Sequence, residues 1–456
     1  MSEKIMKKSR VLIALLLGTV MIAALTMWGC GGSGGTSGYV DPSATTTKSA
    51  AIIDAATLKG WIDEGKLNAP FGSRDRVVVV SYSTLADWTA TAKGHIPGAV
   101  RLDKDKTEVA KDRIEGLALA TTMMPDGPMM DGIIQRLGID ANTTIVFTIP
   151  KAAGSDINNQ AVAFWNFRYW GFSRDRLKIL NGGDDAWDFA GLALATDAVE
   201  KYTASTYSVS KNAALKDVVR FSIGEMIATV DALIATPVLK ADVQMIDVRG
   251  TTISPYLTNA LRATNNVTYL NEHLNGEATR NFVYPTKDVA LSRLASIAVK
   301  DGTTDVFASP TKRTVVMCGS STNAAPTFVL FDAVLNVAEG YIGMYDGSSG
   351  QWNNYNTDRL ALAFPSASTT AVTQRNAWSF NVYTSPTNPK AITSNRAQGA
   401  FASTTKTAVS IWAVFFPILA PSHVDMNQIE NIDKAYMAPV TTPTGGTSGG
   451  GTPGGC

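Results

Sequence analysis

Short apolar runs alternate with helix-type patterns along residues 51–200. Val77–Val80 and Ile145–Phe147 are β-branched or aromatic runs typical of buried strands, and Leu177–Leu180 is a third strand candidate. Between the last two, Ala161–Trp170 has the apolar content of a buried helix. Strands that alternate with helices predict an α/β fold, in which a parallel sheet is flanked by helices.

Residues 215–358 repeat this order. Val243–Ile246 and Thr314–Met317 are predicted strands, and Tyr341–Tyr345 is a final short one. A helix is expected over Ala324–Val337, where Pro326 falls in the first turn and is tolerated there.

The two regions also share three motifs in the same order. The paired segments are Gly94–Ala99 with Glu272–Glu277, Val146–Thr148 with Val316–Cys318, and Leu180–Trp187 with Tyr345–Trp352. Chance similarity between two α/β domains is the alternative, but three ordered matches favour a duplicated domain. The spacing is far too long for a solenoid repeat.

The charge balance excludes some function classes. The chain has 456 residues with 40 Lys+Arg against 39 Asp+Glu, a net charge of +1. Such a chain lacks the basic field of a general nucleic-acid binder, so no nucleic-acid partner is expected. With only three cysteines and three histidines, a disulfide scaffold, a metal site and a cofactor such as haem are not expected either.

The N-terminus resembles an export signal. Lys4, Lys7, Lys8 and Arg10 precede an apolar stretch, Val11–Met27, which is a little short for the alternative, a transmembrane anchor. The stretch ends in Gly29-Cys30, as in bacterial lipoproteins, whose cysteine is acylated. We therefore expect a signal over 1–29, lipidation of Cys30, a flexible tether over 30–50, and a cell-envelope location on a membrane.

The pattern changes after the second repeat. Residues 359–437 are rich in Ala, Thr, Ser and Asn and form a C-terminal extension of unassigned role. Its apolar run, Ala408–Ala420, is too short to cross a bilayer and favours packing on the main body. Residues 438–456 are a Gly/Thr/Pro-rich tail that ends in Cys456.

Cys318 is the candidate nucleophile. It follows a β-branched strand and opens the loop Cys-Gly-Ser-Ser-Thr-Asn over 318–323, just before a predicted helix. Converging backbone N–H groups and a helix N-terminus stabilise a thiolate, so the pKa of Cys318 is expected to lie below its ordinary value. The alternative is a buried structural cysteine at a strand end.

Four stretches resemble the rhodanese family of sulfurtransferases, specifically its tandem two-domain members. They are Gly94–Val100, Ile246–Arg249, Cys318–Ser320, and Tyr345–Ser348 with Trp352. The resemblance covers about residues 51–358. It implies two rhodanese-like domains, 51–200 and 215–358, each a parallel sheet flanked by helices, with the second one catalytic. Thr148 aligns with Cys318, so the first domain is expected to be inactive and to wall the cleft.

The resemblance also implies a mechanism. Cys318 would take a sulfane sulfur from thiosulfate or mercaptopyruvate as a persulfide and pass it to a thiol, cyanide or protein acceptor. The persulfide would be held by the loop residues Gly319, Ser320, Ser321, Thr322 and Asn323. Asp247 and Arg249 would shape the floor of the cleft.

This sequence departs from the family at several positions. The family commonly has Gly at position 321 and Val-Thr at 322–323, and thiosulfate-type members put cations in the loop, where this chain has none. Arg262 and Arg280 are candidates for binding the anionic substrate, with solvated surface arginines as the alternative. His95 and His273 are expected to be structural.

Two other classes of function compete with a transferase. One is a non-enzymatic carrier or assembly factor for sulfur, selenium or tellurium, since the layout resembles rhodanese-like lipoproteins linked to selenite or tellurite reduction. The other is a structural surface protein. A cysteine phosphatase or arsenate reductase is disfavoured, because Ala324 and Ala325 stand where those enzymes need an arginine.

Overall fold

The computed structural model describes residues 50–115, 118–198, 203–226, 229, 242–249, 261–263, 272–301, 304–349, 351–352 and 427–438. The expected signal, Cys30, the Ala408–Ala420 run and Cys456 lie outside these residues. Within the described residues, no helix has the length and hydropathy that crossing a bilayer requires.

The first sheet is parallel throughout. In the described part of the chain it has five strands in the order β1-β7-β6-β2-β3. Their bounds are Ile52–Ile53 (β1), Leu177–Leu180 (β7), Thr144–Thr148 (β6), Val77–Ser83 (β2) and Val100–Asp103 (β3). The three runs predicted as strands all lie in this sheet, so this part of the prediction is confirmed.

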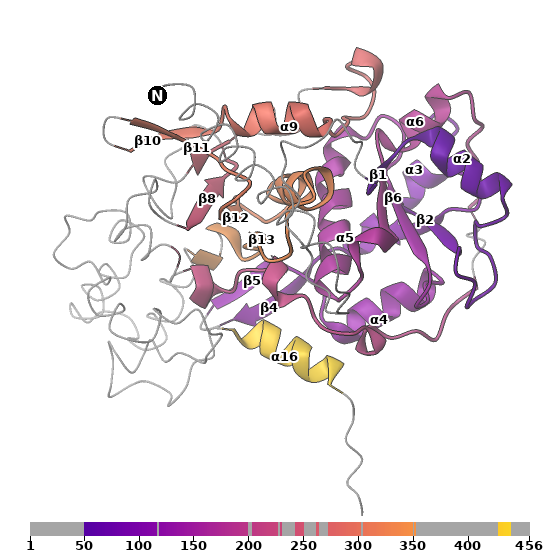
Figure 1. Cartoon of the computed structure of the whole chain (residues 1–456). Helices are drawn as coiled ribbons and strands as arrows, with labels where there is room; N and C mark the ends of the chain where they lie inside the picture. Colours follow the sequence, from indigo (N-terminus) through magenta and orange to yellow (C-terminus); the bar gives the residue numbers. More distant parts are fainter. Residues whose placement is uncertain are drawn as a thin grey trace, which may run out of the picture. The chain divides into compact units, whose positions relative to one another are not determined.

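Helices cover both faces of this sheet (Figure 1). Alternate residues of β2 separate the two cores: Val77 and Val79 pack with α2, α3 and α6, whereas Val78 and Val80 pack with α4 and α5. The helices are α2 (Ala55–Asp63), α3 (Leu85–Thr89), α4 (Gly127–Arg136), α5 (Ile157–Tyr169) and α6 (Gly183–Phe189). This alternation follows from the two-residue period of a strand, which explains why a strand buried on both faces is a continuous valine run.

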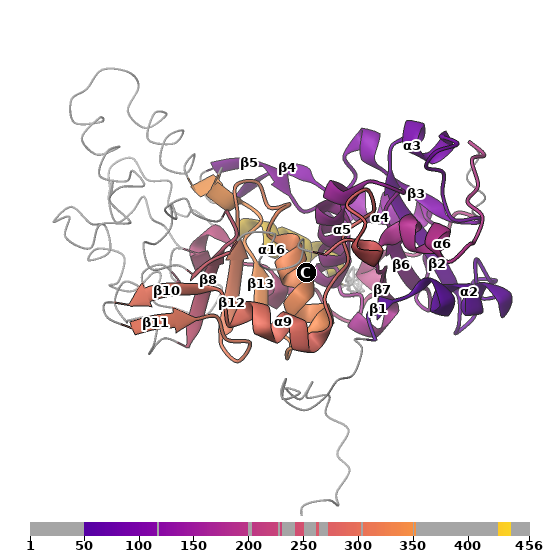
Figure 2. The same ribbon diagram turned by 90° about the horizontal axis from the view of Figure 1, so that it is seen from above.

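The second sheet repeats the strand order of the first. Among the described residues it runs β13-β12-β8-β9, all parallel, and β12 lies between β8 and β13 (Figure 1; Figure 2). The bounds are Ile342–Met344 (β13), Arg313–Met317 (β12), Val243–Asp247 (β8) and Leu261–Arg262 (β9). The strands β7, β6, β2 and β3 are their counterparts in the first sheet.

The remaining elements lie outside the two sheets. Two antiparallel hairpins are formed by β4 (Lys111–Glu115) with β5 (Ala118–Met123), and by β10 (Ala298–Asp301) with β11 (Thr304–Phe307). The helices are α9 (Lys287–Leu294), α10 (Ala325–Val329) and α16 (Gln428–Met437). The helix predicted over Ala324–Val337 is shorter, because α10 continues only as a π-helical turn, Leu330–Val334.

One apolar core joins the two repeats. Helix α5 is buried along nearly its whole length and contacts α10 directly. The aromatic residues of Phe164–Trp170 lie along this helix and its C-cap, and they pack in the same core. The described residues of both repeats belong to one compact unit, and the division into domains at 51–200 and 215–358 stays a prediction.

Candidate active site

Cys318 follows β12 directly, at the carboxyl end of the second sheet. Its neighbours on either side are the ends of β8 and β13, since β12 pairs with both strands. Val248 N–H donates to Met317 O at 3.0 Å, and Ser349 N–H donates to Cys318 O at 3.1 Å. Three parallel strands therefore end around this one side chain, where α/β sheets usually place their ligands.

The loop after Cys318 directs polar groups at its sulfur. The backbone N–H groups of Ser320, Asn323 and Ala324 all act on Sγ, as does the hydroxyl of Ser348, whose Oγ lies 4.0 Å away. Of the residues expected to cradle a persulfide, Ser320 and Asn323 thus supply backbone donors.

Thr322 and Ser321 form hydrogen bonds with other groups. Thr322 N–H donates to Ser320 O, and Ser321 N–H donates to Ser348 Oγ at 2.6 Å. Ser321 has φ +68°, a left-handed conformation that costs a non-glycine residue about 1–2 kcal/mol. The glycine common in the resembling family at this position is thus explained by the backbone.

The expected direction of the Cys318 pKa is wrong. The side chain is fully buried, and this burial raises the pKa of the thiol above its ordinary value, although the loop donors oppose the shift. Desolvation penalises the charged thiolate and outweighs three N–H groups and one hydroxyl. The predicted donors are present, but burial determines the direction of the pKa shift.

Asp247 and Arg249 lie beside the loop, as expected for the floor of the site. Arg249 Nη2 contacts Asp247 Oδ2 at 2.7 Å, and Arg249 N–H donates to Asp247 Oδ1. A Cβ built on Gly319 would lie 4.0 Å from Arg249 Cδ. This arginine is part-exposed, so it brings a positive charge next to the loop.

Ser348 and Ser349 belong to the site but were missed as site residues. Ser349 Oγ donates to Gly319 O at 3.3 Å, and Ser348 has φ +52° in a tight turn. The signal was present in the sequence: the Tyr345–Ser348 motif follows β13, and β13 neighbours the strand that carries Cys318.

The first repeat contacts the loop from outside. Asn158 Nδ2 donates to Asn323 Oδ1 at 2.8 Å, and Ser321 Oγ donates to Thr122 O at 3.1 Å. Both partners, from α5 and β5, precede residue 200. The first repeat thus contacts the loop, and its role as the wall of a cleft stays a prediction.

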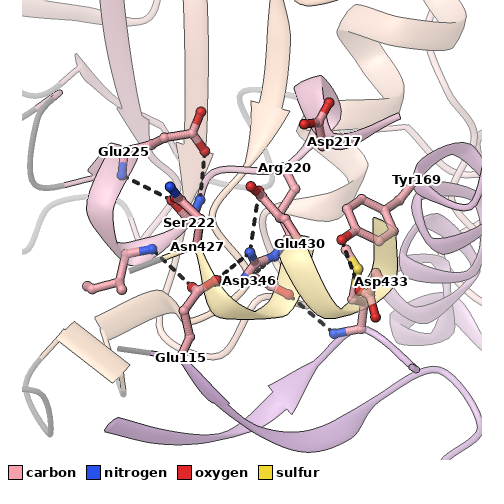
Figure 3. A network of polar contacts seen from close by, with 12 residues as sticks. Glu115, Tyr169, Asp217, Arg220, Ser222, Glu225, Asp346, Asn427, Glu430 and Asp433 are labelled. Carbon is pink, nitrogen blue, oxygen red and sulfur yellow. Dashed lines mark hydrogen bonds and ion pairs between the residues drawn. The ribbon is translucent and has the colours of Figure 1, made fainter. Parts of the chain in front are cut away.

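A buried ion network supports the turn that carries Ser348 (Figure 3). Arg220 binds Glu115 through both terminal nitrogens at 2.8 and 2.9 Å, and its Nε donates to Asp346 at 2.9 Å. Glu430 lies 3.5 Å from the same guanidinium. All four side chains are fully buried. Burial raises the pKa of Glu115, which Arg220 only partly offsets.

Helix α16 joins this network from the unassigned C-terminal extension (Figure 3). Besides Glu430, its Asp433 receives a bidentate pair of bonds from Arg113 at 2.7 and 2.8 Å and one from Tyr169 Oη at 2.9 Å. The extension thus contributes buried charges to the body that holds the site.

The first sheet shows what occupies the equivalent position. Strand pairing aligns Thr144–Thr148 with Arg313–Met317, and Asp184 N–H donates to Ile149 O just as Ser349 N–H donates to Cys318 O. Ile149, not Thr148, is therefore the counterpart of Cys318, so the predicted alignment was wrong by one residue. Neither residue is a thiol, so the conclusion that this repeat lacks the nucleophile is unaffected.

Asn281 of the second repeat fills the loop after Ile149. Its amide donates to Pro150 O at 2.9 Å and to Gly182 O at 3.2 Å, and its Oδ1 accepts from Ala153 N–H at 2.7 Å. The side chain is fully buried. The first-repeat loop is thus held by direct hydrogen bonds to the second repeat.

Asp184 gives a testable pH dependence. It is fully buried, accepts one bond from Thr148 Oγ1 at 2.6 Å, and has its pKa raised by burial from 3.8 to about 8. The folded state therefore keeps a proton that the unfolded chain loses above its own pKa. Between these two values, this group lowers the free energy of unfolding by about 1.4 kcal/mol per pH unit as pH rises.

Asp184→Asn is expected to remove this slope, since the amide stays neutral at every pH. Urea unfolding at several pH values should show that the stability of the variant increases relative to that of the wild type as the pH rises from acid to alkaline. The matched control is Asp112→Asn at an exposed position, which should leave the slope unchanged. Parallel curves for Asp184→Asn and the wild type would refute the raised pKa.

Other candidates lie in structural roles. Arg280 contacts Glu277, Asp185 and Asp188 and covers the Phe189 ring, so its charge is already paired with carboxylates of the protein. The side chain of Arg262 lies outside the described residues. His95 stacks on Trp88 at 3.6 Å, and His273 Nδ1 lies 2.6 Å from Arg280 O, which agrees with structural roles for both histidines.

Comparison with known proteins gives a distant relative. No family model matches the chain. The thiosulfate sulfurtransferase of Corynebacterium glutamicum is 26% identical over 267 residues, which cover 57% of this chain and 77% of the relative. Solved structures that align include an anaerobic ergothioneine biosynthesis enzyme from Chlorobium limicola (TM-score 0.46, 17% identity, 67% and 68% coverage) and YnjE (TM-score 0.46, 16% identity, 66% and 66% coverage). The chain is thus similar in sequence to a sulfurtransferase over a little more than half of its length.

Proposed function

We propose that this chain is an exported, lipid-anchored sulfurtransferase that works through a persulfide on Cys318. The thiolate attacks the sulfane sulfur of thiosulfate, an S–S bond forms at Sγ, and sulfite leaves with the electrons of the broken bond. With 3-mercaptopyruvate the C–S bond breaks instead, and the leaving enolate takes a proton to become pyruvate. An acceptor thiolate then attacks the outer sulfur and releases Cys318.

The observation that carries this proposal is the geometry around Sγ. Three backbone N–H groups and one hydroxyl act on a single sulfur at the end of an inner strand of its sheet. Such donors stabilise negative charge that develops on sulfur during transfer. Arg249 adds a part-exposed positive charge beside the loop, which suits an anionic donor.

The location is part of the same proposal. Acylation of Cys30 behind the expected signal holds the body at a membrane of the cell envelope through the Gly/Ser tether. A protein acceptor that is itself at this membrane would then receive the sulfur.

One observation favours a second function. Burial raises the pKa of Cys318, and a thiol with a small thiolate fraction reacts slowly. A non-enzymatic carrier or assembly factor needs one slow loading step with sulfur, selenium or tellurium and a persulfide-type species held away from solvent, which suits this cysteine.

Intact mass spectrometry separates the two functions. The full chain is incubated with thiosulfate or 3-mercaptopyruvate, and a gain of one sulfur atom is expected on Cys318. Turnover with cyanide or a thiol then identifies a transferase, whereas a sulfur adduct without turnover identifies a carrier. Incubation with selenite and a thiol tests for a selenium adduct. Absence of any adduct at Cys318 under all these conditions would refute both functions.

A further inference from the structure

A cavity of about 460 Å³ opens between the two repeats. The first repeat contributes β1, the start of α2 and β7 to its wall, and the second contributes the segment Tyr284–Asp288 and Val334. None of the loop residues 318–323 lines it. Its size lies in the range of small-molecule sites, which is about 300–1,000 Å³.

Two buried lysines line this cavity. Lys178 on β7 is 9% exposed and Lys287 at the start of α9 is 7% exposed. Among the residues that the structure describes, neither ammonium forms a hydrogen bond or an ion pair. Burial also lowers the pKa of Lys178. Asp175 opposes this shift only in part. The two ammonium groups give the wall of the cavity positive charge, with which the head of a bound anion would pair.

Two helices begin at the same cavity. Helix α2 starts after Asp54 and α9 starts after Thr286, and both of these residues line the wall. The N-cap of α2 is occupied, because Asp54 Oδ1 accepts from Thr57 N–H at 2.8 Å. The N-cap of α9 is not, since Thr286 makes no side-chain cap bond. The positive end of α9 therefore adds to the two lysines.

The rest of the wall is a mixture of apolar and polar residues, and it includes two carboxylates at the solvent-exposed edge. Ile52, Trp61 and Val334 face the cavity. Asp54 and Asp288 also line it, but both are exposed to solvent. The floor is fixed by a pair of bonds between repeats, from Asn181 Nδ2 to Tyr284 O at 3.1 Å and from Tyr284 N–H to Asn181 Oδ1 at 2.7 Å.

We propose that this cavity binds a small amphipathic anion, whose carboxylate or phosphate head contacts Lys178, Lys287 and the start of α9 while its apolar body packs on Ile52, Trp61 and Val334. The site lies apart from Cys318 and does not depend on sulfur transfer. Because its wall comes from both repeats, an occupant also links them.

Titration calorimetry on the full chain with Cys30→Ser tests this site. Octanoate and octyl phosphate serve as probes, which separate the carboxylate from the phosphate head. Octanol and inorganic phosphate each lack one half of the proposed chemistry. At least one of the two anionic probes should bind roughly tenfold more tightly than octanol and than inorganic phosphate.

Replacing Lys178 by methionine should weaken the binding of the probe without lowering the melting temperature of the free protein. Lys178→Met and Lys287→Met should each weaken the bound probe roughly tenfold, whereas Lys59→Gln, an exposed lysine on α2 paired with Asp63, should not. Without ligand, Lys178→Met should melt at or above the wild-type temperature, because it removes a cation whose burial outweighs the attraction of Asp175. Binding that is equal for octanol and octanoate, that survives both methionine variants, or that is absent for both anions would overturn the proposal.

Discussion

Cys318→Ser is expected to reduce sulfur transfer to the uncatalysed background, a loss of at least about 10³-fold. Serine cannot form a persulfide, and the N–H groups of Ser320, Asn323 and Ala324 then surround an oxygen that carries no sulfur. Thermal melting should change little, since serine is close to cysteine in size. An assay of sulfur transfer from thiosulfate to cyanide measures the loss of activity, and intact mass spectrometry shows whether a persulfide forms.

The same cysteine predicts how the rate depends on pH. Because burial raises its pKa, the thiolate fraction and the rate of persulfide formation should still rise with pH beyond the ordinary range of a thiol. Ser348→Ala should shift the profile further to alkaline pH, as the Ser348 hydroxyl lowers this pKa. Cys456→Ser is the matched control and should keep wild-type rates. A rate that is already maximal below neutral pH would contradict the role of burial.

Arg220→Met is expected to cost about 3–5 kcal/mol of unfolding free energy. The change leaves Glu115, Asp346 and Glu430 buried without the guanidinium that binds all three. Such a loss is a large part of the total stability of a typical domain. Urea unfolding followed by far-UV circular dichroism measures it, with Arg74→Met at an exposed position as the control.

Two further results distinguish lost charge pairing from lost packing. Adding Glu115→Gln to Arg220→Met should recover part of the stability, because it removes one uncompensated carboxylate. The single variant should also gain stability as the pH falls, since the buried carboxyls then hold protons that the unfolded chain holds only at lower pH. A loss no larger than that of Arg74→Met would show that the network contributes little.

The strands that build the site could be predicted because they are continuous runs of mostly apolar residues. Val77–Val80 and Thr314–Met317 are apolar on both faces, as strands between two helical layers must be. The short elements β1 and β9 have two residues each and offer no period to detect. The place of β1 in its sheet also depends on β7, a partner far along the chain.

The sequence predicted which residues lie together at the candidate site, but not the pKa of its cysteine. Cys318, its loop, Asp247 and Arg249 do come together, because parallel strands end at one edge. The direction of the pKa shift of Cys318 could not be predicted, because it depends on burial by residues from elsewhere in the fold. Thr148 was aligned with Cys318 in place of Ile149 for a simpler reason. A short motif match without gaps does not detect a shift of one residue between two strands.

The role of α16 was not visible in the sequence for the same reason. Glu430 and Asp433 resemble ordinary exposed charges on a short amphipathic helix. Their partners, Arg220 and Arg113, precede them by more than two hundred residues. Only the folded chain shows that these charges are buried.

That separation also sets an order for the assembly of the molecule. Synthesis proceeds from the N-terminus, so Arg113 and Arg220 emerge long before Glu430 and Asp433 of α16. Until α16 arrives, Arg113 has no carboxylate at the position of Asp433, and the Arg220 cluster lacks one of its acids. The body is thus completed late, after both sheets have been made, and a chain cut short before α16 should remain in a looser state that proteases and chaperones recognise.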